Sequence, residues 1–192
     1  MCGSNMPAAI ATGPAEDARD LRPRAVETAA SQGFWRRLGA NAVALPYTDV
    51  LPSLQTGLVN GTDNDLVSMF FAEFFTAARH LTLTNHSYNF GALVLSKRWF
   101  DSLPADQQAA LLKTPEGERA RSRSEVRGLQ DWIVGQMRDA GVSVVELDET
   151  QRATWLAAMD GFDTELAATQ GGQSKDIAVR IAEARAAFAA GQ

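Results

Sequence analysis

Short apolar segments typical of strands alternate with longer segments of helical character along most of this chain. Three of the helical segments end at a glycine, namely Gly39, Gly57 and Gly141, and glycine commonly lies just past the last turn of a helix. Strands that alternate with helices are typical of domains whose helices pack on a parallel sheet. The sequence therefore predicts an α/β fold with a largely parallel sheet.

Turn residues and the spacing of apolar positions predict where the elements begin and end. Residues 1–18 are rich in Ala, Gly, Pro, Ser and Asn, which predicts a loose leader before a folded part over residues 19–192. Thr48 is the expected N-cap of a helix, and Pro115 and Gly117 are expected to interrupt a long helix near its start. The expected strands cover 21–27, 41–45, 81–84, 91–95 and 142–147, and the expected helices cover 29–38, 49–56, 66–78, 102–139, 149–168 and 175–190.

The chain is acidic, with 18 Lys and Arg against 23 Asp and Glu and a formal net charge of -5. Nucleic-acid binding needs clustered cations that neutralise phosphates, so this balance excludes DNA and RNA as partners. The arginines between 119 and 127 alternate with glutamates, a pattern typical of a solvated helix face. Cys2 is the single cysteine, so an internal disulfide is impossible, and residues 1–14 do not have the pattern of an export signal.

Residues that commonly carry catalysis are scarce. The chain has two histidines, His80 and His86, and their separation is not a metal-ligand spacing on a helix. Neither a Gly-x-Ser-x-Gly nucleophile turn nor a Gly-rich phosphate loop occurs. The sequence therefore predicts a protein that is not an enzyme and that uses neither a cofactor nor a metal.

Three stretches carry a resemblance to a known family. They contain Leu-Gly-Ala at 38–40 with Pro-Tyr, Leu-Gln-Thr-Gly and Val-Asn-Gly-Thr-Asp-Asn up to residue 64, then Leu-Thr-Leu-Thr-Asn-His at 81–86, and Ser-Lys-Arg-Trp-Phe-Asp-Ser-Leu-Pro at 96–104. Together they resemble the DctP-type solute-binding proteins of TRAP transporters. The resemblance implies part of a two-lobed, type II-like periplasmic-binding-protein fold with a long connecting helix and C-terminal helices. It also implies capture of a small organic carboxylate in the periplasm for membrane subunits.

The same resemblance implies which residues contact the ligand. Arg24 lies at the family's interval before Leu-Gly-Ala and corresponds to the arginine that pairs with the ligand carboxylate, which a planar guanidinium can bind at two points. Tyr47 corresponds to an aromatic wall beside the ligand, and Asn64 to an asparagine that hydrogen-bonds it. His86 corresponds to a strand-end histidine of the polar network. Asp63 stands where the family often has Glu, and its shorter side chain is expected to alter that network.

From the residue types alone, other interpretations of these positions stay open. Arg24 follows Arg19 and Arg22 and could be one of several surface arginines. Tyr47 could pack in the core. Asn64 lies in a segment dense in turn residues, where asparagine is common for its turn chemistry alone.

The resemblance begins well inside the second lobe of the family's fold. We therefore expect a truncated chain without most of the first lobe and without an export signal. Apolar surface that the first lobe covers would then be exposed, and solvent would screen Arg24 on its open side. Two further hypotheses are a truncated receptor without independent function, and a small enzyme that acts on a carboxylate with His86 as general base.

Overall fold

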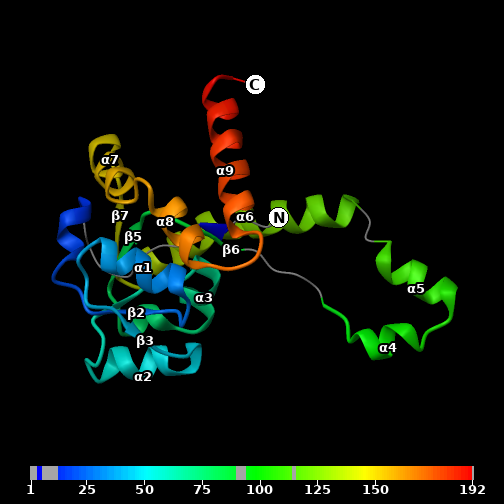
Figure 1. The fold of residues 1–192 in the computed structure, drawn as a ribbon. Helices are drawn as coiled ribbons and strands as arrows, with labels where there is room; N and C mark the ends of the chain where they lie inside the picture. The colour runs from blue at the N-terminus through cyan, green and yellow to red at the C-terminus, as the bar shows by residue number, and fades with distance from the viewer. Residues whose placement is uncertain (1–3, 6–12, 90–93, 114–115, 192) are drawn as a thin grey trace.

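A three-stranded parallel sheet lies between α1 (Ala29–Arg37) and α2 (Val50–Gln55) in the compact part of the structure, a computed structural model (Figure 1). β2 (Pro23–Ala25) lies between β3 (Val43–Ala44) and β4 (Gly61–Thr62). A second parallel pair joins β5 (His80–Leu83) to β7 (Ser143–Glu146). The prediction of an α/β fold with a largely parallel sheet is therefore confirmed. The structure describes residues 4–5, 13–89, 94–113 and 116–191.

An antiparallel pair joins a strand near the N-terminus to a strand near the middle of the chain. It consists of β1 (Ser4–Asn5) and β6 (Tyr88–Asn89). The strand expected over 91–95 falls mainly outside the described residues, and Val94 and Leu95 belong to no strand.

Helix α1 (Ala29–Arg37) connects the parallel strands β2 and β3. Thr28 caps its N-terminus, since the Thr28 hydroxyl accepts a hydrogen bond from the Ser31 amide at 3.2 Å. Gly39 follows the helix with a φ of 78°, a left-handed conformation that glycine adopts without steric cost. A helix between two parallel strands runs antiparallel to them. α1 therefore begins at the carboxyl edge of the sheet and ends at the opposite edge.

The helix expected over 49–56 is present as α2 (Val50–Gln55), but Thr48 is not its N-cap. Thr48 lies instead in a 3-10 turn, η2 (Tyr47–Asp49), where its hydroxyl donates to the Asp49 carboxylate at 3.1 Å. The preceding Pro46 starts this turn, and the first α-helical residue is Val50, one position further along the chain than expected.

The single helix expected over 66–78 is wrong. α3 (Leu66–Phe71) begins where expected, and the Asp65 carboxylate caps it by accepting from the Ser68 amide at 2.8 Å. Glu73 then adopts a left-handed φ of 55°, and a short 3-10 helix, η3 (Phe74–Thr76), follows. This turn keeps Phe74 buried in the same cluster as Leu66 and Met69.

The single helix expected over 102–139 is also divided. α4 (Lys97–Asp101) is followed by α5 (Ala105–Leu112) and by the 24-residue α6 (Glu116–Asp139). The break between α5 and α6 lies close to Pro115, as predicted from the ring that removes an amide donor. Gly117, which was also expected to interrupt the helix, lies instead inside α6. In α6 the apolar stripe is buried near the C-terminus, at Ile133 and Met137.

Three helices complete the chain, α7 (Glu149–Ala158), α8 (Phe162–Thr169) and α9 (Ser174–Ala189). The expected helix over 149–168 breaks at Gly161, whose φ of 72° is left-handed. Gly172, also left-handed at 65°, separates α8 from α9, in the gap between the helices expected over 149–168 and 175–190.

Two hydrophobic clusters form the core. The larger one packs α3, η3, β5 and β7 against the C-terminal half of α6. The smaller one joins α1 and α7 to a 3-10 helix, η1 (Ala15–Ala18), in which Ala15 and Ala18 are buried. The loose leader expected over 1–18 is therefore wrong for its last residues, because these two small side chains pack beneath Trp155, whose Nε1 donates to the Gly13 carbonyl at 3.1 Å.

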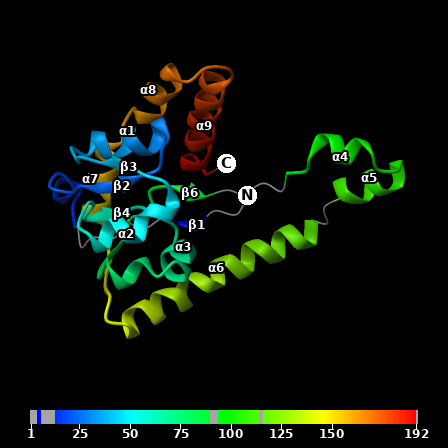
Figure 2. The same ribbon diagram turned by 90° about the horizontal axis from the view of Figure 1, so that it is seen from below.

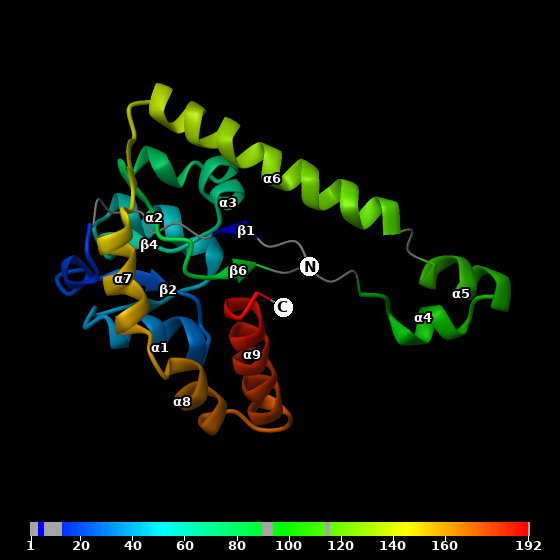
Figure 3. The same ribbon diagram turned by 90° about the horizontal axis from the view of Figure 1, so that it is seen from above.

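The N-terminal half of α6 extends away from the rest of the molecule, with α4 and α5 at its far end (Figures 2 and 3). Neither α4 nor α5 contains a buried residue. Within the part of the chain that the structure describes, no helix is both long enough and apolar enough to cross a membrane.

Candidate functional site

The residues implicated by sequence gather at the carboxyl edges of the parallel strands. Arg24 lies in the central strand β2, paired in register with Thr62 of β4. Asp63 and Asn64 directly follow β4, and Tyr47 follows β3. Side chains from neighbouring strand ends meet at one edge of a parallel sheet, where ligands of open α/β folds commonly bind. The topology therefore places four of the five residues at one edge.

Arg24 is the buried cation of this edge, with 4% of its surface exposed. Its Nε donates a hydrogen bond to the Leu45 carbonyl oxygen at 2.8 Å. Among the residues that the structure describes, none accepts a hydrogen bond from either terminal amino group of Arg24. The guanidinium is thus held through Nε, while its two terminal amino groups, the outer fork, can form a two-point pair with an oxyanion.

Burial lowers the pKa of Arg24, while the negative charges that Asp63, Glu27 and Tyr47 carry when ionised act in the opposite direction. Taking a cation out of water disfavours its charged form, and a nearby anion restores it. An arginine starts from so high a pKa that the guanidinium keeps its charge at neutral pH. The edge therefore carries a partly desolvated positive charge.

Asp63, at this edge, lies next to His86. His86 Nε2 is 3.8 Å from Asp63 Oδ2, which is too long for a hydrogen bond. The Oδ1 atom of Asp63 is buried and has no hydrogen-bond partner among the described residues. The two groups are thus close enough to interact by charge if His86 is protonated, but they do not form a tight pair.

Two further contacts fix the ring of His86. Its Nδ1 lies 2.7 Å from the Thr84 hydroxyl, and the Phe34 ring stacks on it with centroids 4.3 Å apart and planes at 16°. Phe34 belongs to α1 and to the smaller core cluster. The core therefore positions His86 through an aromatic contact.

Asn64 and Tyr47 differ in their surroundings. Asn64 is 6% exposed, and its Nδ2 donates to the Thr62 hydroxyl at 2.8 Å. Tyr47 is 46% exposed and touches the Phe74 ring at a centroid distance of 5.4 Å. Tyr47 is therefore a half-open aromatic surface and not part of the core, whereas Asn64 is fixed in a buried turn.

Sequence reasoning missed the supporting residues. Leu45 contributes a backbone carbonyl, Phe34 a ring, and Thr62 and Thr84 hydroxyl groups. Both threonines lie within the motifs that carry the family resemblance, next to Asp63 and two residues before His86, so their spacing was a usable signal. The only sequence signal for Phe34 was its place on the apolar face of a predicted helix.

The two histidines do not form a joint site. His80 is the first residue of β5 and is exposed, whereas His86 follows the other end of that strand. No cluster of three or more His, Cys, Asp or Glu side chains within the described ranges could hold a metal ion. The arrangement around Arg24 instead combines one cation, one amide and one aromatic ring at one edge of the sheet.

The model of the bacterial extracellular solute-binding proteins, family 7, matches residues 12–169. The chain belongs to this family. The C4-dicarboxylate-binding periplasmic protein DctP of Rhodobacter capsulatus is 27% identical over 160 residues, which cover 83% of this chain and 48% of that protein. The chain thus spans about half the length of this curated relative.

Solved structures show the same fold. The sugar acid binding protein DctPAm of Advenella mimigardefordensis, in complex with galactonate, superposes with a TM-score of 0.83 at 22% identity, covering 94% of this chain and 59% of that one. A TRAP periplasmic solute-binding protein of Shewanella oneidensis with bound succinate gives a TM-score of 0.79 at 21% identity, covering 94% and 60%. The DctP-type resemblance and the partial periplasmic-binding-protein fold are therefore confirmed.

Proposed function

We propose that this chain is the carboxylate-binding part of a periplasmic receptor that captures a small organic carboxylate and delivers it to the membrane subunits of a TRAP transporter. The observation that carries the proposal is the state of Arg24. It is a buried guanidinium at the carboxyl edge of the sheet, held through Nε, and its two terminal amino groups have no partner among the described residues. Family membership supports this assignment, as do the succinate and galactonate bound to proteins of the same fold.

Binding requires no chemical step. The two oxygens of a carboxylate pair with the terminal amino groups of Arg24, and the side chain of Asn64 orients the ligand from the adjacent strand end. The exposed Tyr47 ring forms a wall beside the ligand. The negative charge of the Asp63 carboxylate offsets part of the cost of burying the Arg24 cation. His86 lies beside Asp63 and belongs to the same polar network.

The side of this edge that carries Tyr47 is open in the described structure. Water on that side screens the pair between Arg24 and the ligand, so binding to this chain alone is weaker and more salt-dependent than binding in an enclosed site. A receptor of this kind captures its ligand by closing over it and releases it on opening.

A thermal-shift screen of small carboxylates tests the proposal. A ligand at a hundred times its Kd stabilises a protein by about 2.7 kcal/mol, which corresponds to a rise in Tm of roughly 5–11 °C for a chain of this size. Arg24→Ala should abolish that rise, while Arg24→Lys keeps the charge but loses the fork and should retain only part of it. Arg121→Ala, on the exposed face of α6, is the matched control and should keep all of it.

A truncated receptor without independent function makes the opposite prediction. No carboxylate would then raise the Tm of the wild-type chain. Stabilisation that survives Arg24→Ala would show binding elsewhere and would remove Arg24 as the anchor.

A further inference from the structure

A groove of about 460 Å³ lies between η1, the end of α1 and α7. Its volume is within the range of roughly 300–1,000 Å³ that small-molecule sites occupy. Leu38 and Ala15, exposed by 4% and 5%, form an apolar floor. The residues that line it are Ala15, Glu16, Arg19, Arg36, Arg37, Leu38, Gly39, Thr154, Ala157 and Ala158.

This groove is separate from the Arg24 edge. Because α1 runs antiparallel to β2 and β3, its last residues lie at the amino edge of the sheet. Arg24 belongs to the group of residues at the carboxyl edge. None of the residues assigned to carboxylate capture lines the groove. A ligand there would therefore not compete for the same atoms.

Three arginines line the groove, and two of them have side chains that meet no partner within the described ranges. Arg37 is occupied, because its Nε donates to the Ala158 carbonyl at 2.9 Å and its terminal groups contact Glu165 and the Asp160 carbonyl. The guanidinium groups of Arg19 and Arg36 make no hydrogen bond or ion pair with any residue in the described part of the chain.

The aliphatic stem of Arg19 lies close to Gly39. A Cβ placed on Gly39 would lie 3.2 Å from Cγ of Arg19, so the stem would have to shift by a few tenths of an ångström to make room for it. Arg19 is exposed to solvent.

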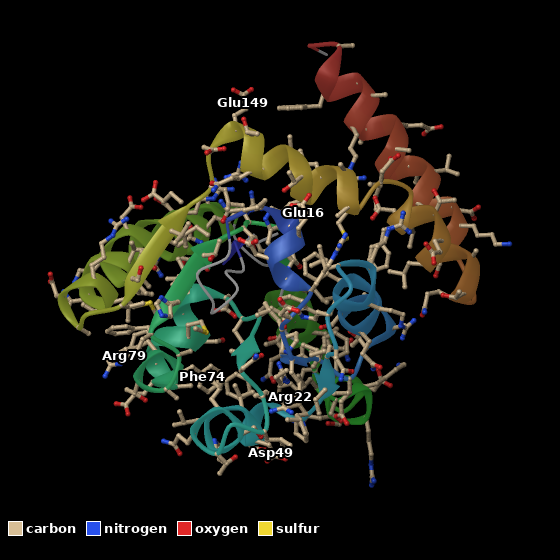
Figure 4. The ribbon with its side chains drawn as sticks, turned by 90° about the vertical axis from the view of Figure 1, so that its left-hand side faces the viewer. Glu16, Arg22, Asp49, Phe74, Arg79 and Glu149 are labelled. Carbon is tan, nitrogen blue, oxygen red and sulfur yellow. The ribbon has the colours of Figure 1, made fainter. Side chains whose placement is uncertain are left out.

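One carboxylate opposes the two cations. Glu16 lines the same groove and has no ion-pair partner among the described residues. Figure 4 labels it on η1, beside α7. The groove therefore combines one carboxylate and an apolar floor with two guanidinium groups that no described residue pairs with, on a chain whose net charge is -5.

We propose that this groove is a second anion-binding site, in which Arg19 and Arg36 bind the oxyanion groups of a small molecule. Guanidinium groups pair with carboxylate and phosphate oxygens through the same planar fork, and Leu38 and Ala15 offer apolar contact to the rest of the ligand. The cations are exposed to water, so binding is weak and falls with salt. The inference does not depend on the function proposed for Arg24.

Titration with inorganic phosphate, followed by the backbone amide signals of the chain, tests this site. We expect saturable shifts at Leu38 and Gly39, both in the wild type and in Arg24→Ala. Shifts in the Arg24→Ala chain separate this site from carboxylate capture, because that variant has lost the proposed anchor of the other edge.

Charge variants give the sign of the effect. Arg36→Gln should weaken phosphate binding by up to about fivefold, the range of an exposed ion pair, and Glu16→Gln should strengthen it by up to about threefold on the same grounds. Arg121→Gln on α6 should leave it unchanged. The absence of saturable shifts at Gly39, or equal affinity in the wild type, Arg36→Gln and Glu16→Gln, would overturn the proposal.

Discussion

Replacing Phe34 by alanine is expected to weaken both the fold and the binding edge, because this ring joins the smaller core cluster to His86. Phe34 is 8% exposed. It meets Trp35 edge-on at 5.2 Å, Trp155 at 6.3 Å and His86 at 4.3 Å between ring centroids. Truncating a buried phenylalanine costs roughly 3–5 kcal/mol through lost burial and the cavity left behind.

For a chain of this size each kcal/mol lowers the Tm by about 2–4 °C, so the expected loss for Phe34→Ala is roughly 6–20 °C. Calorimetric unfolding measures it. Phe188→Ala is the matched control, since Phe188 on α9 is 85% exposed and surface substitutions usually change stability by less than about 0.5 kcal/mol.

The same variant has a second readout at the site. Loss of the stacking partner frees the His86 ring, and an aromatic contact of this kind contributes about 0.5–1.5 kcal/mol, so any carboxylate affinity should fall by roughly two- to twelvefold. Equal Tm values for Phe34→Ala and Phe188→Ala would refute the packing of α1 against this cluster. A loss of stability with unchanged affinity would refute the link between Phe34 and the site.

Two further predictions concern local structure. Asp148→Ala should lower the free energy of unfolding in urea by about 0.5–2 kcal/mol, because it removes half of a capping box at the start of α7. In this box the Asp148 carboxylate accepts from the Gln151 amide at 2.8 Å, and the Gln151 side chain accepts from the Asp148 amide at 3.1 Å. An unchanged urea midpoint would rule out this contribution. Gly39→Ala should lower the free energy of unfolding by about 1–2 kcal/mol, because Gly39 has a φ of 78°. Gly128→Ala, in open space within α6, should raise it by about 0.5–1 kcal/mol. A change of the same sign in both variants would contradict the left-handed conformation of Gly39.

Most strands and helices could be predicted from sequence because apolar segments and glycine helix ends are local signals. The exceptions include β4, which lies in a segment dense in turn residues, and α4, which begins before the helix expected from residue 102. The residues around Arg24 could be named only through the family resemblance, since their residue types alone left other interpretations open. The structure brings four of them together at one edge of the parallel sheet. Long-range packing was not accessible in this way. The stacking of Phe34 on His86 joins two segments far apart in the chain, and nothing in either segment specifies the other.

The errors have physical causes as well. The apolar run over 66–78 predicts one helix, but Glu73 turns left-handed at a φ of 55° and tertiary packing of Phe74 outweighs the local preference. Ala15 and Ala18 lie in a segment whose composition predicts a loose leader. Their small size is what allows close packing against α1 and α7.

The central claim, that Arg24 anchors the ligand carboxylate, is tested most directly by a crystal structure of the chain with the carboxylate that gives the largest rise in Tm. The account predicts both carboxylate oxygens within hydrogen-bonding distance of the terminal amino groups of Arg24, with Nε still donating to the Leu45 carbonyl. A carboxylate bound elsewhere, with the outer fork of Arg24 contacting only protein or water, would contradict it.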